Sequence, residues 1–442
     1  MKKIKENFSN IIILFSFLLG FSSLFYGINI IKVDYNWASK IISFSIIFLI
    51  FFFLLFILPK KIKDYIIVVL TTIYLAFLSV NLYLQNSIPS HKVSLIDIAK
   101  EKNLKLDTRS KVQVIKEMRK DNKNVFSSVH AGLFQTDIPK DEIIRNNIYP
   151  LSGISNVTTV MCNESGFFSI YKSDRFGFNN DNLIYEKKAN NIMLVGDSMI
   201  HGQCVKEGDD IAGYLRKKGY NAFSFGISSN GPLTELATIR EYAKFIEPKI
   251  IFWFFHPNDF YDIKREIHTP ILKNYLSEDF SQNLIKKQSE IDFFVKKVLE
   301  KKTIKKNIKK KKDLTFFLKY IGSQLTLNNL RYYFNITAVS NDYDTFNKIL
   351  FLAKKEAINV NAKLYFIYLP DKRELQISKN DKKIFTILDD LMIETFNFKE
   401  YLKNSDDPLQ YFPWRRMIHF NKNGYELIGN VLINNFLSIE DD

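Results

Sequence analysis

Three long apolar segments before residue 85 constrain this chain more than any other feature. They run from Ile11 to Ile31, from Ile41 to Leu58 and from Tyr65 to Leu84, and none contains a charged residue. Each holds about 18 to 21 residues, enough for a helix to cross a hydrocarbon core of roughly 30 Å. Three such segments without a polar face argue against helices of a soluble core. The first is too long for a cleaved signal peptide, and no small-residue cleavage site follows it. We therefore predict a three-span transmembrane region over residues 1–86.

The lysines that flank these segments predict an orientation. Lysine stands before the first segment and between the second and third, at Lys2, Lys3, Lys5, Lys60, Lys61 and Lys63. The loop between the first and second segments carries only two lysines. Loops rich in lysine and arginine usually remain on the cytoplasmic side of a membrane, so the N-terminus is expected in the cytoplasm of a bacterial cell. Everything after about residue 86 is then expected on the periplasmic or extracellular side of the inner (cell) membrane. The net charge of +15 does not oppose this, since long domains translocate largely regardless of charge.

The rest of the chain has the pattern of an α/β domain. We predict a linker and lead-in over residues 87–170, with a helical stretch from Ile96 to Met118, and a domain over residues 171–442. Apolar strands are expected at Ile192–Val195, Ala222–Phe225, Ile250–Phe255 and Leu364–Leu369, with helices at about 211–218, 233–245, 344–357 and 424–436. Continuous apolar strands that alternate with helices indicate a parallel sheet covered on both faces. A lysine-rich helical insertion interrupts the alternation at about residues 260–340.

Residues suited to acyl-transfer chemistry stand at the ends of these strands, where open parallel sheets bind ligands. Ser198 follows the first strand in Gly196-Asp197-Ser198, at or near the start of the next helix, and Gly226 follows the second. The third strand leads into His256-Pro257-Asn258-Asp259, and His419 stands near the C-terminus. Singly, each has a plainer explanation: a helix N-cap for the serine, a strand terminator for the glycine, a turn for the asparagine.

Together, in this order, the four blocks resemble the GDSL/SGNH hydrolase family over about residues 170–436. Segment 173–178 is also similar to lead-ins of membrane-attached bacterial members. The resemblance implies a flavodoxin-like three-layer α/β/α fold and no cofactor or metal. It implies Ser198 as nucleophile and His419 as general base. It also implies an oxyanion hole formed by the backbone N–H groups of Ser198 and Gly226 and the side-chain amide of Asn258.

The sequence departs from the family pattern beside the histidine. An aspartate usually stands three residues before it, but that position holds Arg416. The nearest upstream carboxylates are Asp406 and Asp407, and either of them, or a backbone carbonyl, is a candidate to orient the imidazole. The sequence alone therefore supports a Ser-His dyad.

The two cysteines, Cys162 and Cys204, are too few for a disulfide scaffold and do not form a CxxC motif. In an oxidising compartment they can pair. The bond would close a loop of about 40 residues and contribute roughly 4 kcal/mol by the chain-entropy estimate. Two unrelated buried thiols are the alternative.

Three functions fit these features. The first is a serine esterase or deacylase that acts on an acylated glycan or envelope lipid outside the membrane. The second is an O-acetyltransferase that uses the same serine and needs a membrane partner to deliver the acyl group. The third is a non-catalytic binding module of the same fold. Nucleic acid is not an expected partner, because no aromatic-interleaved basic motif or zinc-ligand spacing occurs.

Overall fold

The chain forms two compact units. The structure, a computed structural model, describes residues 2–30, 35–87, 95–136, 147–187, 190–308, 322–327, 329–330, 342–370, 372, 375 and 381–437. The helical unit comprises Met1–Lys92 and Lys312–Thr337, and the α/β unit comprises Val93–Lys311 and Ala338–Asp442. These boundaries differ from the predicted ones, because the lead-in belongs to the α/β unit and part of the insertion belongs to the helical unit.

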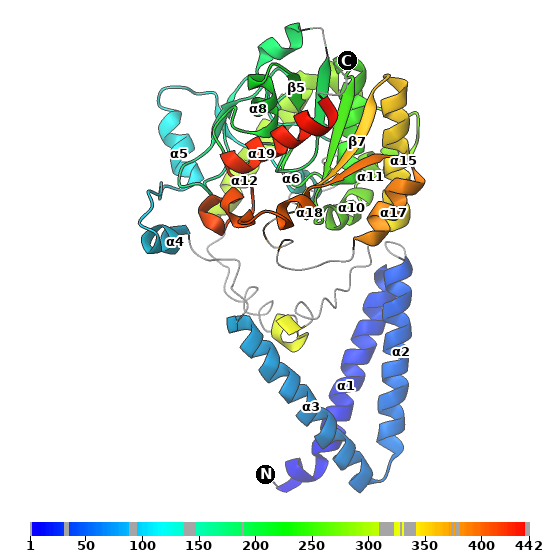
Figure 1. Cartoon of the computed structure of the whole chain (residues 1–442). Helices are drawn as coiled ribbons and strands as arrows, with labels where there is room; N and C mark the ends of the chain where they lie inside the picture. Colours follow the sequence, from blue (N-terminus) through cyan, green and yellow to red (C-terminus); the bar gives the residue numbers. More distant parts are fainter. Residues whose placement is uncertain are drawn as a thin grey trace. The chain divides into compact units, whose positions relative to one another are not determined.

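The helical unit is built on α1 (Lys2–Ile30), α2 (Tyr35–Ile57) and α3 (Lys60–Ser87) (Figure 1). Two stretches are long and apolar enough to cross a membrane, Ser9–Tyr26 and Lys60–Leu84. Only 22% of the first and 11% of the second is buried, which distinguishes them from core helices of a soluble protein. The apolar part of α2, Ile41–Ile57, is shorter. The exposed apolar surface indicates association with a membrane.

A piece of the insertion packs on α3 within the helical unit. The Asn81 side chain is fully buried, and its Oδ1 accepts hydrogen bonds from the N–H groups of Asn329 (2.9 Å) and Leu330 (3.0 Å). Asn81 Nδ2 donates to Gln324 Oε1 at 2.7 Å. Tyr74 on the same helix donates its hydroxyl to a backbone carbonyl of this piece at 2.9 Å. Part of the insertion therefore belongs to the fold of the helical unit, although the chain on both sides of it belongs to the α/β unit.

A five-stranded parallel sheet lies at the centre of the α/β unit. Its spatial order is β5 (Asn221–Ser224), β4 (Asn191–Val195), β6 (Ile250–Phe255), β7 (Lys363–Tyr368) and β8 (Glu394–Asn397). In chain order this is 2-1-3-4-5, the order of flavodoxin-like doubly wound sheets. The parallel sheet is confirmed, but β8 was not predicted. Its Glu-Thr-Phe-Asn sequence lacks a continuous apolar run, and no residue of it is fully buried.

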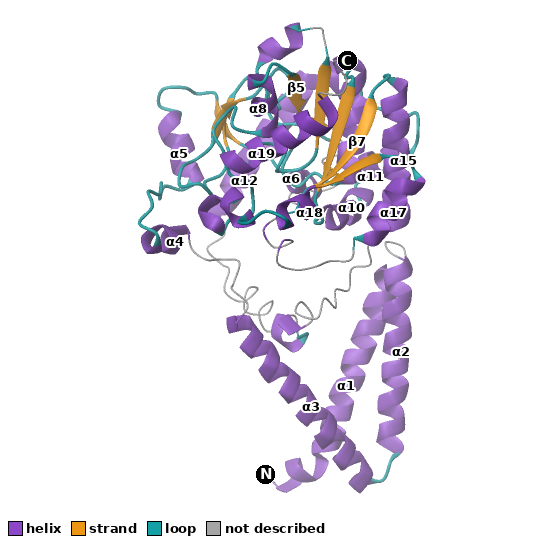
Figure 2. Cartoon of the chain, in the orientation of Figure 1, coloured by secondary structure: helices purple, strands orange, loops and turns teal. Residues whose placement is uncertain are grey.

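Helices cover both faces of this sheet (Figure 2). All six residues of β6 are buried, and successive side chains enter opposite cores because they alternate across a strand. Trp253 packs in the core under α9 (Pro232–Ile246) and α15 (Tyr343–Asn359). Phe252 packs in the core under α8 (Ile211–Lys217) and α19 (Lys422–Leu432). The unit is thus a three-layer α/β/α structure.

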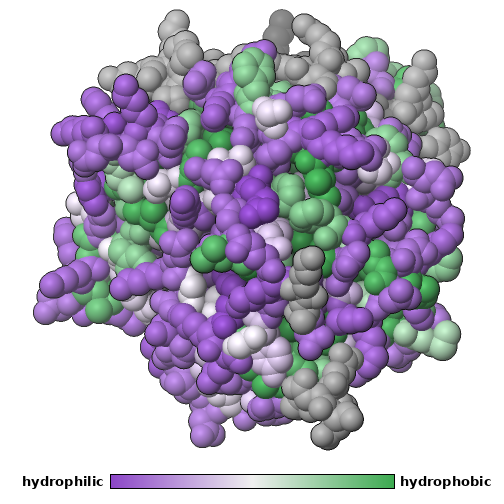
Figure 3. All heavy atoms as spheres, turned by 90° about the horizontal axis from the view of Figure 1, so that it is seen from above, coloured by the Kyte–Doolittle hydropathy of each residue, from purple (hydrophilic) through white to green (hydrophobic). Residues whose placement is uncertain are grey.

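The described residues of the predicted linker, 95–136 and 147–170, are folded. The sequence predicts one helical stretch here, from Ile96 to Met118, but the structure has two helices, α4 (Leu95–Glu101) and α5 (Lys111–Met118). A small sheet follows, in which β1 (Val125–Ser127) pairs in parallel with β2 (Thr158–Val160), and β2 pairs antiparallel with β3 (Ile170–Lys172). Strands of three residues are too short to produce a recognisable periodicity, so sequence patterns did not reveal them. The face drawn in Figure 3 is largely hydrophilic, with hydrophobic side chains in small groups.

Candidate active site

Ser198 lies in a tight turn at the carboxyl end of β4. Residues 197–204, here called the nucleophile turn, form a series of hydrogen-bonded turns, and the next helix begins only at Ile211. The expected position at the start of a helix is therefore wrong. Backbone hydrogen bonds from His201 N–H to the Asp197 carbonyl (3.0 Å) and from Gln203 N–H to the Ser198 carbonyl (3.1 Å) define the turn.

The structure brings Ser198 and His419 together, although they are 221 positions apart. Ser198 Oγ lies 3.0 Å from His419 Nε2 and 3.1 Å from Asp197 Oδ2. Its single hydroxyl hydrogen can point to either acceptor. His419 comes just before α19, whose N-cap Asn421 accepts a hydrogen bond from Gly424 N–H at 3.0 Å and so fixes the start of that helix. The serine hydroxyl and the imidazole therefore have hydrogen-bonding geometry suited to proton transfer.

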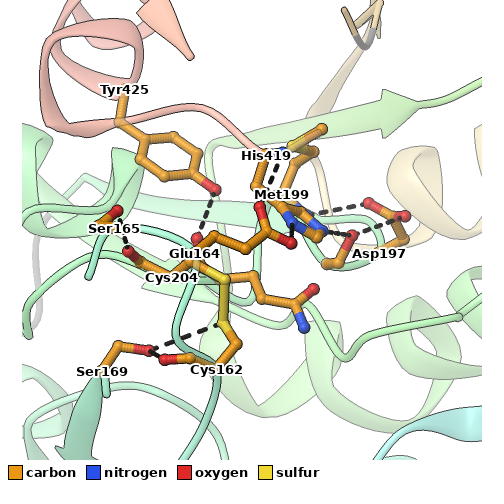
Figure 4. Close-up of polar contacts among 11 residues, drawn as sticks. Cys162, Glu164, Ser165, Ser169, Asp197, Met199, Cys204, His419 and Tyr425 are labelled. Atoms are coloured by element: carbon orange, nitrogen blue, oxygen red, sulfur yellow. Dashed lines mark hydrogen bonds and ion pairs between the residues drawn. A yellow bond between two sulfur atoms is a disulfide. The ribbon is translucent and has the colours of Figure 1, made fainter. Parts of the chain in front are cut away.

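A residue that the sequence did not single out, Glu164, completes the group. Glu164 Oε1 lies 2.9 Å from His419 Nδ1, and Glu164 Oε2 accepts from the His419 backbone N–H at 3.4 Å (Figure 4). A carboxylate at Nδ1 holds the ring hydrogen there, which leaves Nε2 as an acceptor facing Ser198. Glu164 lies on the loop between β2 and β3, within the segment predicted as a lead-in. The spacing of the cysteines could have located it, because Glu164 is two residues from Cys162 and Cys204 is six residues from Ser198.

Asp406 and Asp407 do not orient His419. Asp407 forms a two-pronged ion pair with Arg415, with N–O distances of 2.5 and 2.6 Å, and Asp406 makes no contact with the imidazole among the described residues. The prediction fails because Nδ1 of His419 is already occupied by Glu164. Arg416, at the usual aspartate position, pairs with Glu101 of α4 at 2.8 and 2.9 Å.

The environment keeps Glu164 ionised. Burial raises the pKa of this carboxyl, but the charge of His419 and hydrogen bonds from His419 and the Ile418 backbone outweigh it, so the pKa of Glu164 is lowered from its ordinary value. The side chains of His419 and Glu164 are 13% and 17% exposed. A partly shielded carboxylate in this position favours the imidazolium that forms when a serine loses its proton.

The residues predicted for an oxyanion hole have free donors. The N–H groups of Ser198 and Gly226 make no hydrogen bond within the described part of the chain. Gly226 packs so closely on the nucleophile turn that a Cβ would lie 2.4 Å from His201 N. Asn258 directs its Oδ1 toward His256 Nδ1, and its Nδ2 donates to none of the described groups. The donors that the sequence named thus remain available at the ends of β4, β5 and β6.

Cys162 and Cys204 form a disulfide. Glu164, Cys204 and His419 offer ligand atoms within 4.8 Å of one another, the only such group in the described residues. A sulfur bonded to another sulfur is not the thiolate that metals bind, so this group fits a disulfide beside an acid and a base better than a metal centre.

A scan of known protein-family models found no match to this sequence, and no curated protein is detectably similar to it. The geometry of Ser198, His419 and Glu164 therefore carries the functional argument.

Proposed function

We propose that this protein is a membrane-anchored serine ester hydrolase of the SGNH type, which removes an O-acyl group from an acylated glycan or envelope lipid. One observation carries the proposal: the hydrogen-bonded series from Ser198 Oγ to His419 Nε2 and from His419 Nδ1 to Glu164. The free N–H groups of Ser198 and Gly226 support it, and so does the strand order of the sheet.

The chemistry follows from the order of these contacts. Ser198 Oγ attacks the ester carbonyl carbon while His419 Nε2 takes the hydroxyl proton. Glu164 stabilises the resulting imidazolium. The N–H groups of Ser198 and Gly226 and the Asn258 amide would hold the oxyanion, and one such donor typically contributes about 3 to 4 kcal/mol. His419 then gives its proton to the departing alcohol, and a water molecule releases the acyl group as a carboxylic acid by the same steps.

The proposal includes the three-span anchor with the N-terminus in the cytoplasm and the α/β unit on the periplasmic or extracellular side of a bacterial inner membrane. The lysines at the start of α1 and at the start of α3 support this orientation. The disulfide fits an oxidising compartment.

The test is hydrolysis of p-nitrophenyl acetate by the full-length protein in detergent. Ser198→Ala and His419→Ala are each expected to lower kcat by at least about a thousandfold, because each removes a group that acts in the transition state. Ser405→Ala, at a serine outside the site, serves as the control and is expected to keep wild-type kcat.

Hydrolysis that survives Ser198→Ala would contradict the proposal. Acyl transfer to added polysaccharide without release of free acid would instead favour an O-acetyltransferase, and a requirement for a membrane extract would indicate a partner that donates the acyl group. A folded protein that neither turns over esters nor reacts with a fluorophosphonate at Ser198 would be a non-catalytic binding module.

A further inference from the structure

The loop that carries Glu164 has no regular secondary structure of its own. Residues 161–169, here called the acid arm, join β2 to β3. Two backbone hydrogen bonds close its base, from Met161 N–H to the Ser169 carbonyl and from Ser169 N–H to the Cys162 carbonyl, each 2.8 Å long. An irregular loop samples many conformations unless other groups hold it. The position of the Glu164 carboxylate therefore depends on what the acid arm is attached to.

Two attachments of the acid arm end on a single residue, Cys204. Cys162 is disulfide-bonded to it, and Ser165 Oγ donates a hydrogen bond to its carbonyl at 2.9 Å. Glu164 lies between Cys162 and Ser165, so it is held on both sides by the same partner (Figure 4). Further hydrogen bonds join Asn163 and Gly166 of the arm to Asp107 in the lead-in. The ring centre of Phe167 lies 5.7 Å from Lys206 Nζ, and Phe168 packs against the apolar cluster of Val114, Val125 and Val160. The disulfide is thus the covalent link between acid and nucleophile.

Cys204 is itself fixed relative to the nucleophile. It is the last residue of the nucleophile turn, and its side chain is fully buried. The preceding residue, Gln203, donates its N–H to the Ser198 carbonyl at 3.1 Å and accepts a hydrogen bond from the Tyr425 hydroxyl at 3.4 Å. A disulfide attached at Cys204 therefore fixes the acid arm in position relative to Ser198. Such placement matters, because a displacement of about 1 Å can lower a rate by about a hundredfold.

We propose that the Cys162–Cys204 disulfide is a positioning element of the active site, which holds the Glu164 carboxylate against His419, so that full ester hydrolysis requires the bond to be formed. This inference rests on the proposed hydrolase function. Reduction by a dithiol adds two electrons and two protons to the bond and gives two thiols, while the dithiol becomes a cyclic disulfide. Cys162 is partly exposed and gives the reductant access. In a reducing cytoplasm the protein would stay in its weakly active form.

The test compares four full-length proteins in detergent with p-nitrophenyl acetate: wild type, Cys162→Ser/Cys204→Ser, Glu164→Gln and the triple variant. Loss of the disulfide is expected to lower kcat by about a hundredfold or more, close to the effect of Glu164→Gln itself, with KM changed by less than about twofold. Glu164→Gln is expected to lower kcat strongly in the wild type but by less than about threefold in the disulfide-free protein, because the carboxylate is already displaced there. An equal effect of Glu164→Gln in both backgrounds would overturn the proposal.

Reduction of the wild type with dithiothreitol gives a second measurement that needs no cysteine substitution. Mass spectrometry establishes that both thiols are free, and circular dichroism follows the fold. Activity is expected to fall on reduction, to return on reoxidation, and to change little in Glu164→Gln. Unchanged wild-type activity, or loss of the whole fold, would overturn the positioning role. Hydrolysis that is insensitive to Ser198→Ala would instead overturn the hydrolase function, so the two failures are distinguishable.

Discussion

At the scale of single residues, the sequence named the proposed nucleophile and the proposed base but not the proposed acid. Ser198 and His419 could be named because each stands in a short block at a strand end. Glu164 was not named, because it lies 255 positions from the histidine in a loop without periodicity, where the nearby Cys162 is the one sequence signal that points to it. Only a tertiary contact brings it to the imidazole. The position where the family pattern has an aspartate holds Arg416, which forms an ion pair with Glu101.

Glu164→Gln tests the acid. It keeps the shape of the side chain but removes the charge that stabilises the imidazolium, so kcat/KM is expected to fall by about a hundred- to ten-thousandfold. Since the carboxylate favours protonated His419, its loss should move the acidic limb of the kcat/KM profile to lower pH.

Glu164 should also make the stability of the folded protein depend on pH in a predictable direction. The pKa of Glu164 is lowered in the folded protein, so its contribution is present above its ordinary pKa and is lost as pH falls through the folded value. The wild-type Tm should therefore fall more steeply in acid than that of Glu164→Gln. Glu101→Gln, which breaks an exposed ion pair, is the matched control. Wild-type kcat and an unmoved pH profile in Glu164→Gln would show that this carboxylate has no role.

At the scale of elements, apolar runs predicted the four long strands and the helices over about 211–218, 233–245 and 344–357 to within one or two residues of the observed bounds. The last helix, predicted to end at about residue 436, ends at Leu432 and is followed by a π-helical turn over Ile433–Leu437. The nucleophile turn and the small sheet were missed because hydrogen bonds between particular backbone groups define them, and hydrophobicity does not. The entry into α9 is a similar case. Its N-cap is Gly231, which has no side chain to satisfy the first N–H groups.

Glu266 of α10 (Asp259–Ile267) supplies that cap from another helix. The fully buried carboxyl accepts hydrogen bonds from the N–H groups of Gly231 (2.8 Å), Leu233 (2.9 Å) and Thr234 (3.2 Å). Glu266→Ala would leave these donors buried without partners, at a cost of about 1 to 3 kcal/mol each. We expect a clear drop in the Tm of the detergent-solubilised protein, with Glu394→Ala, at an exposed site, as control. An unchanged Tm would exclude the cap.

At the scale of the whole molecule, the sequence indicated an apolar part and an α/β part. It did not indicate that part of the insertion packs with the helical unit. No periodicity marks residues 322–330 as partners of α3. Their association depends on polar groups, chiefly the buried side chain of Asn81. Polar residues on apolar helices often link helices in this way.

Asn81→Leu tests this association. It removes the acceptor of two backbone N–H groups, and a loss of about 1 kcal/mol would raise the population of released segment roughly fivefold. Limited proteolysis in membranes, read by mass spectrometry, should show faster cleavage within residues 322–330. Ser79→Ala is the control, since among the described residues the Ser79 hydroxyl bonds only within its own helix, to the Leu75 carbonyl at 2.9 Å. Equal cleavage rates in the two variants would mean that Asn81 does not hold the segment.

The placement of the acid arm ahead of the five-stranded sheet has a practical consequence for anyone shortening this protein. A fragment that starts at the sheet would contain every strand of the central layer, the serine and the histidine, and would look complete by its topology. It would nevertheless lack Glu164 and leave Cys204 as an unpaired thiol. The smallest fragment that keeps the whole candidate site is therefore expected to begin near Val93, at the boundary of the α/β unit.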